Sequence, residues 1–274
     1  SEDNFINGVY LYNDIINRRR YKFKKRLNHT LNNIKKSFRY NKSKKYKKIL
    51  VLGGYGNKIE NRNAGDEAQL NDTLQILYRE FPDYLVKVLS PNPHDTRIQH
   101  YNCIVGEAPR TAFYNFDKPY SPYHLHNCWD KVKFLLTGTL IYLNAFLIRM
   151  NLPPVFINAR KSSLLYEIKT SDLIYFSGGG YLTGDTLPRL WDGMFFIRIA
   201  KVFKVPVVLS GQTIGIWNNG FNRRFAKWGL SKADLITLRD LGISKDDLEE
   251  IGLQGEHIFD TFDDALFCKR LNDK

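Results

Sequence analysis

The chain contains 274 residues, of which 43% are hydrophobic and 25% are charged, and its formal net charge is +13. This length is enough for one large domain or two small ones with a sizeable buried core. Most of the charge lies at one end, because residues 1–48 hold fifteen Lys and Arg against three acidic residues, and the other 226 residues carry only +1. The nearly neutral body argues against a basic nucleic-acid groove across the domain, so we expect no nucleic-acid partner.

The basic segment at residues 1–48 has a helical pattern, in which apolar side chains recur every three or four positions between Lys and Arg residues. These apolar residues are Leu27, Leu31, Ile34 and Phe38. A basic amphipathic helix of this kind lies on an anionic membrane surface, or packs on its own domain with a solvated basic face, or binds nucleic acid. We expect a basic helical arm with an anionic membrane as a candidate partner.

Short apolar runs alternate with helical patterns along the rest of the chain. The apolar runs predict strands at residues 49–52, 85–89, 172–176, 205–209, 234–238 and 257–259. The helical patterns predict a helix that carries Leu70, Leu74 and Leu77 and stops before Pro82, and further helices at about residues 128–150, 189–203, 219–231 and 244–252. This alternation predicts a Rossmann-like α/β domain over residues 49–268, with right-handed crossovers and a doubly wound, mostly parallel sheet.

The longest uncharged run covers residues 134–148. It is shorter than the roughly 20 residues that a membrane-spanning helix needs, and it contains Gly138 and Asn144. We interpret it as a helix that is either buried in the core or grazes a membrane surface, and burial is the favoured interpretation.

The cysteines bear on compartment and on metal binding. Cys103, Cys128 and Cys268 form no CxxC pair, so neither a disulfide framework nor a zinc knuckle is indicated, and a reducing compartment fits best. His124 and His126 precede Cys128, but no second cluster of ligands follows. We therefore expect no metal site.

In open α/β sheets, ligands bind beyond the carboxyl ends of the strands, at a topological switch point. The first predicted strand runs into a glycine loop at residues 53–56, and Asp66 and Glu67 follow in the first turn of the next helix. Glycine lets the backbone approach a ligand closely, whereas the two carboxylates either complement the helix dipole or face a hydroxyl-bearing acceptor. The spacing is not G-x-G-x-x-G, so a dinucleotide site is not supported.

Two further strand ends carry unusual residues. Gly178, Gly179 and Gly180 follow one predicted strand, and three glycines favour a close backbone approach to a ligand over an approach to another strand. Gln212 and Thr213 follow the next strand. They offer an amide and a hydroxyl to a ligand, or they serve strand-to-helix packing.

Arg239 stands at the end of a fourth predicted strand. An arginine there either grips a phosphate or carboxylate through two hydrogen bonds or pairs with the neighbouring Asp240. Ser244 is predicted to cap the helix at residues 244–252, because Asp247 lies three positions later, as in a capping box.

Taken together and in this order, the motifs resemble the polysaccharide pyruvyl transferase family. The resembling segments are residues 63–68, 177–182, 211–215 and 238–240, and the resemblance extends over about residues 49–268. It implies one half of a GT-B-like enzyme that moves the enolpyruvyl-derived group of phosphoenolpyruvate onto a saccharide hydroxyl in the cytoplasm, forming a pyruvate ketal. Phosphoenolpyruvate is then the donor substrate, and no cofactor is expected.

The resemblance also implies site residues and partners. Asp66, Glu67 and Arg239 are the expected catalytic residues, and the expected substrate-binding residues are Gly54, Gly56, Asn63, Gly65, Gly178, Gly179, Gly180, Gln212 and Thr213. The expected partners are a saccharide acceptor, often lipid-linked in this family, and a second Rossmann-like half of the same enzyme, to which residues 269–274 begin a linker. Alternative functions are a nucleotide-sugar glycosyltransferase on the same scaffold and a non-catalytic module that binds membranes or polyanions.

The sequence departs from the family pattern at three places. The first loop carries extra residues at 58–62, and Ile216 stands where the family typically has proline. The spacing from Arg239 to Ser244 is one residue longer than usual.

Overall fold

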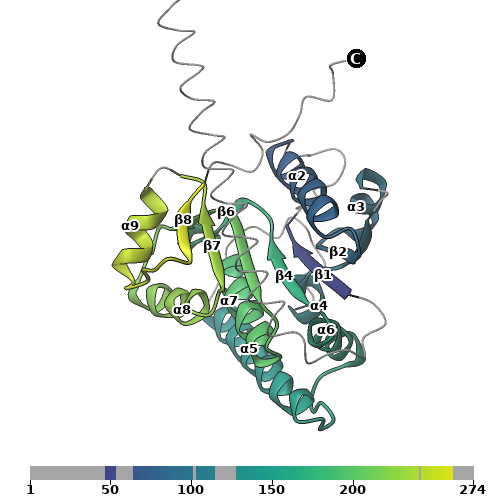
Figure 1. Ribbon diagram of the computed structural model, residues 1–274. Coiled ribbons are helices and arrows are strands. Elements are labelled where there is room, and N and C mark those ends of the chain that lie inside the picture. Colours follow the sequence, from purple (N-terminus) through teal and green to yellow (C-terminus); the bar gives the residue numbers. More distant parts are fainter. Residues whose placement is uncertain (1–46, 54–63, 101–102, 115–127, 241, 262–274) are drawn as a thin grey trace, which may run out of the picture.

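The computed structural model describes residues 47–53, 64–100, 103–114, 128–240 and 242–261 (Figure 1). The expected arm over residues 1–46, the glycines Gly54 and Gly56, Asn63, the histidines His124 and His126, and residues 262–274 lie outside these ranges. The arm was expected to end at residue 48, but Lys47 and Lys48 already belong to the first strand.

The described chain builds a parallel β-sheet. Its strands are β1 (Lys47–Leu52), β2 (Tyr84–Ser90), β3 (Ile104–Glu107), β4 (Leu173–Phe176), β5 (Gly179–Thr183), β6 (Val207–Gly215), β7 (Leu235–Leu238) and β8 (Ile258–Asp260). The order is β3-β2-β1-β4-β6-β7-β8, with β5 also paired to β6, and every pairing is parallel. This is the doubly wound order in which the chain reverses direction between β1 and β4. The predicted α/β class with a mostly parallel sheet is confirmed; the second, GT-B-like half stays a prediction.

Helices cover both faces of this sheet (Figure 1). They are α2 (Ala64–Glu80), α3 (Pro93–Gln99), α4 (Pro109–Tyr114), α5 (Cys128–Arg149), α6 (Ala159–Lys169), α7 (Leu187–Val202), α8 (Gly220–Leu230) and α9 (Ile243–Glu250). Strand residues alternate between the faces: Ile49 and Val51 pack with α2, whereas Leu50 and Leu52 pack with the cluster around α7. This period of two follows from the pleat of a strand that is buried on both sides.

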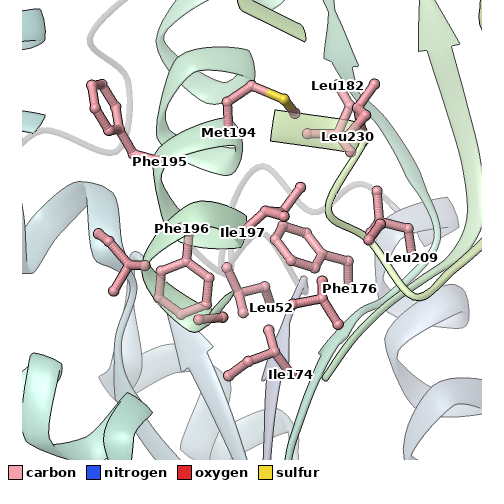
Figure 2. Close-up of a cluster of buried hydrophobic side chains, with 14 of the residues drawn as sticks. Leu52, Ile174, Phe176, Leu182, Met194, Phe195, Phe196, Ile197, Leu209 and Leu230 are labelled. Atoms are coloured by element: carbon pink, nitrogen blue, oxygen red, sulfur yellow. The ribbon is translucent and has the colours of Figure 1, made fainter. Parts of the chain in front are cut away.

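Helix α7 is the centre of the larger core, and 11 of its 16 residues are buried. Figure 2 shows Phe196 and Ile197 among strand residues such as Leu52 and Phe176. On another side of α7, the Phe195 ring lies 5.3 Å from the Phe225 ring of α8, and it fills the space that Gly138 of α5 leaves open. A helix that is apolar on nearly all sides is buried between layers.

Helix α5 has two unlike faces. Phe134, Ile141, Ala145 and Ile148 are buried on one face. The opposite face exposes five large apolar side chains, which are Trp129, Val132, Leu136, Leu143 and Phe146. By length and composition α5 could cross a membrane, although core helices of soluble proteins pass the same test. The prediction that this helix is buried in the core is therefore confirmed for one of its faces only.

Five elements were not predicted, namely β3, β5, α3, α4 and α6. They are short, and the strands among them carry weak patterns: β3 has four residues with one buried valine, and β5 begins with two glycines. Predicted and observed boundaries of the remaining elements agree to within a few residues, except at β6. That strand continues through residues 210–215, which were expected to form a loop.

We expect Phe196→Ala to lower the free energy of unfolding by about 3–5 kcal/mol, because the side chain is fully buried and its loss leaves a cavity. Urea denaturation followed by circular dichroism measures this change. Leu143→Ala is the control, since Leu143 is 54% exposed and its truncation should stay within about 0.5 kcal/mol. Equal losses in both variants would contradict the central place of α7.

Candidate functional site

A cavity of about 50 Å³ lies at the carboxyl ends of β1, β2 and β4, where the direction of the sheet reverses. Its apolar wall includes Leu52, Leu89 and Phe176, the terminal residues of those strands or their neighbours. The volume exceeds the roughly 10–15 Å³ that one water molecule needs. We call this space the β1/β4 cavity. It occupies the place where open α/β sheets bind ligands.

Four polar side chains complete the wall of the β1/β4 cavity. They are Arg110 at the start of α4, Tyr181 in β5, and Arg189 and Asp192 on α7. Arg189 and Asp192 are three positions apart, so they share one face of the helix. Tyr181 donates its hydroxyl to the Ser177 carbonyl at 2.8 Å. Two guanidinium groups and one carboxyl group therefore border the same small space.

Asp192 supplies the carboxyl group of this cluster, and the surroundings shift its pKa strongly. Burial raises the pKa of Asp192 from 3.8 to about 7, and the positive charge of Arg110 and a hydrogen bond from its backbone N–H oppose this rise. The Asp192 Oδ1 atom is shielded from solvent, and it has no hydrogen-bond partner among the described residues. The Tyr114 ring is near enough that the Asp192 charge helps to raise the pKa of Tyr114 well above its usual value, although burial is the larger cause. A carboxyl group with a pKa of about 7 holds a proton over part of the physiological pH range.

A second polar cluster joins the start of β5, the carboxyl-terminal part of β6 and the residue that follows β7. The Arg239 Nε donates to the Thr213 hydroxyl at 2.7 Å. A Cβ atom on Gly180 would lie 3.2 Å from the Arg239 Nη2, so the absent side chain leaves room for the guanidinium. The structure thus brings together three of the predicted site residues, from three separate motifs.

Gln212 is placed differently from Thr213, because it is fully buried. Its amide nitrogen donates to the carbonyls of Ser177 at 2.5 Å and Ser210 at 2.9 Å. These bonds join β6 to the segment between β4 and β5, which indicates that Gln212 stabilises the sheet. Its role in substrate binding stays a prediction.

Glu67 lies in the first turn of α2, together with Gly65 and Asp66. Its Oε2 lies 2.9 Å from the His100 Nε2 at the end of α3. This contact fixes α2 against α3 and occupies one carboxylate oxygen. Asp66 is half-buried beside it, and the proposed contact of either carboxylate with an acceptor stays a prediction.

The glycine motifs allow close backbone approaches within the protein. A Cβ on Gly53 would lie 1.5 Å from the Ser177 Oγ, so β1 and β4 could not end side by side with any larger residue there. Gly178 precedes β5, and Gly179 and Gly180 begin it. Strand β4 pairs with residues 207–209 of β6, and β5 pairs with residues 212–215 of the same strand. The glycines between β4 and β5 therefore let the chain turn slightly and continue along β6. This supports the alternative in which the three glycines allow a close approach to another strand. Gly180 also lies beside the Arg239 guanidinium.

The predicted capping role of Ser244 is wrong. Helix α9 begins at Ile243, and Ser244 lies buried inside its first turn. The Ser244 backbone N–H donates to the Asp240 Oδ1 at 2.8 Å, and its hydroxyl both donates to Asp240 and accepts the Ile214 N–H at 2.8 Å. Asp240 therefore satisfies the helix terminus, and Ser244 ties α9 to β6.

The departure at Ile216 has a structural reason. Its φ is +54°, and its N–H donates to the Asp247 Oδ2 at 3.3 Å. Proline is locked near φ −65° and lacks an N–H group. The chain around Ile216 thus takes a path that proline could not follow.

Sequence reasoning missed Arg110, Arg189 and Asp192. Arg110 follows β3, which was not predicted, and the other two lie inside a helix without a motif. The signal that could have found them is the presence of charged residues in α7, which is otherwise almost wholly apolar. A buried helix carries charges only where they have partners or a function.

The model of the polysaccharide pyruvyl transferase family matches residues 63–273, which is most of the chain. The chain belongs to this family. The match includes the motifs at residues 63–68, 177–182 and 211–215, the Arg239 cluster and the three cavity residues on α4 and α7, and the family's activity indicates an enzyme. Among curated proteins, none has a sequence that matches this pyruvyl transferase family member. Within the described ranges, no group of three His, Cys, Asp or Glu residues is placed to hold a metal ion.

We expect Ile216→Pro to lower the free energy of unfolding by more than about 1 kcal/mol, because the native φ and the N–H bond are both incompatible with proline. Ile216→Gly should leave it unchanged or raise it, since glycine accepts the left-handed conformation without steric cost. Chemical denaturation of both variants measures the difference. A proline variant as stable as the parent would contradict the observed backbone.

Proposed function

We propose that this protein transfers the pyruvyl group of phosphoenolpyruvate to a saccharide, forms a pyruvate ketal with two hydroxyl groups and releases phosphate. The observation that carries the proposal is the pair of arginines, Arg110 and Arg189, which border the β1/β4 cavity in a member of a pyruvyl transferase family. The donor bears both a phosphate and a carboxylate, and guanidinium groups bind either anion through two parallel hydrogen bonds.

The two polar clusters have different roles in this proposal. Arg110 and Arg189 hold the donor's anionic groups in the β1/β4 cavity, and they stabilise the negative charge that develops as phosphate leaves. Arg239, fixed by Thr213, offers a further cation on the same edge of the sheet. The saccharide acceptor approaches this edge beside the first turn of α2, where Asp66 and Glu67 lie. A second Rossmann-like half facing the edge would complete the cleft.

We further propose that the protein works in the cytoplasm at an anionic membrane that presents a lipid-linked acceptor. The exposed apolar face of α5 supports this placement, because Trp129 and Phe146 are side chains that favour the membrane interface. Lys133 lies over the Trp129 ring at 5.7 Å, and Arg149 is exposed at the other end of the helix. Cations beside an apolar face suit anionic headgroups.

The test of the function is a phosphate-release assay with phosphoenolpyruvate and a panel of acceptors that contain galactose, mannose or glucosamine. We expect release with at least one acceptor, and a ketal product by mass spectrometry. Calorimetry with nucleotide sugars runs in parallel. Nucleotide-sugar binding without phosphate release would favour a glycosyltransferase and overturn the proposal.

Arg239→Ala should lower kcat/KM in this assay at least about tenfold, because a cation at the edge of the site is lost. Arg224→Ala is the matched control, because it removes the same positive charge from an exposed position on α8. Unchanged kinetics in the Arg239 variant would remove this residue from the site.

Leu143→Glu should weaken co-sedimentation with phosphatidylglycerol vesicles in about 0.5 M NaCl, where salt screens the purely electrostatic attraction of exposed basic residues. The reason is that a carboxylate on the α5 face opposes insertion of its apolar side chains. Ile98→Glu on α3, also an exposed apolar position, should not weaken binding. Equal binding by both variants would show that α5 does not touch the vesicle.

A further inference from the structure

The proposed reaction needs an acid that can give a proton to carbon, and the β1/β4 cavity offers few candidates. Its titratable side chains among the described lining residues are Arg110, Arg189, Tyr181 and Asp192. Arginine stays protonated in proteins. The Tyr181 hydroxyl is already donated to the Ser177 carbonyl, and phenols ionise near pH 10. Asp192 is therefore the group whose chemistry suits proton transfer.

We propose that Asp192 is the general acid that protonates the methylene carbon of phosphoenolpyruvate in the β1/β4 cavity. This inference rests on the proposed function and adds a catalytic residue to it. Three observations support it: Asp192 borders the cavity, its Oδ1 has no hydrogen-bond partner in the described part of the chain, and Arg110 and Arg189 border the same space. With the phosphate and the carboxylate of the donor held by the two arginines, this carboxyl group would meet the methylene carbon C3, which is bonded to the carbon that carries both anionic groups.

The step balances without a further reactant. The electron pair of the C2–C3 double bond takes the proton of Asp192, so C3 becomes a methyl group and C2 becomes electrophilic. An acceptor hydroxyl oxygen forms a bond to C2, and its proton returns to the Asp192 carboxylate. The C2–O bond to phosphate then breaks, a second hydroxyl oxygen closes the ketal at C2, and its proton leaves with phosphate.

The surroundings of Asp192 keep its proton available near neutral pH. Burial raises the pKa of Asp192 to about 7, and the groups that face it are Arg110 and Tyr114 from α4 and Arg189 from α7. A general acid works best when its pKa lies near the working pH. Arg110 favours the ionised form through its charge and its backbone N–H, so it also limits the cost of the carboxylate that each proton transfer leaves behind.

The decisive kinetic experiment compares Asp192→Asn with the parent protein and with Asp246→Asn, an exposed change in α9. We expect Asp192→Asn to lower kcat at least about 100-fold while the Kd for phosphoenolpyruvate, measured by calorimetry, stays within about threefold. Asp192→Glu should restore part of kcat, and Arg110→Ala should weaken donor binding instead. A normal kcat in Asp192→Asn, or equal losses of binding and turnover, would overturn the assignment.

A second readout does not depend on turnover. Because the folded-state pKa lies above 3.8, the proton of Asp192 stabilises the native state at low pH, and this contribution is lost as the pH rises through about 7. The stability of Asp192→Asn relative to the parent should therefore rise between about pH 4 and pH 7 and level off above that range. A flat difference would show that Asp192 is already ionised and would overturn its role as the acid. Inactivity of the parent with phosphoenolpyruvate, alongside the expected stability profile, would instead overturn the proposed function and this role with it.

Discussion

The burial of helix α7 is the constraint on which the rest of the structure depends. One side of the helix packs on the strands through residues such as Phe196, and another packs on α5 and α8 through Phe195. A helix held on all sides cannot shift without opening voids in a close-packed core. Arg189 and Asp192, near its N-terminal end, are therefore fixed relative to the carboxyl edge of the sheet. Preorganised polar groups of this kind are what a catalytic site requires.

The same packing sets the electrostatics of the β1/β4 cavity. Burial disfavours a charged Asp192, whereas the Arg110 side chain and backbone favour one, and burial is the larger effect. The balance gives Asp192 a pKa of about 7 in a cavity that two arginines and an apolar wall also border. A fully exposed aspartate would be ionised there, and one without the arginine would hold its proton more tightly.

The Arg239 cluster shows how separate motifs converge on one edge. Gly180 begins β5, Thr213 lies in β6 and Arg239 follows β7, and the parallel pairing of β6 with both neighbours brings the three residues together. The residues around them serve the scaffold instead. Gln212 joins β6 to the path of β4 and β5, and Asp240 with Ser244 ties α9 to the sheet. Scaffold and site are thus interleaved along the same motifs.

The sequence by itself determined the fold class, the longer strands and helices, and the family, because apolar runs with period two or 3.6 and glycines at strand ends are local signals. It also found Arg239 and Thr213, whose motifs stand next to predicted strands. The tertiary structure alone decided which polar groups share a space. Arg110 and Asp192 are 82 positions apart and meet only because α4 and α7 pack together at the end of β1 and β4, and the pKa of Asp192 depends on that meeting. Local sequence patterns do not indicate which residues far apart in the chain are buried together. The cavity and its acid therefore could not be predicted from the sequence alone.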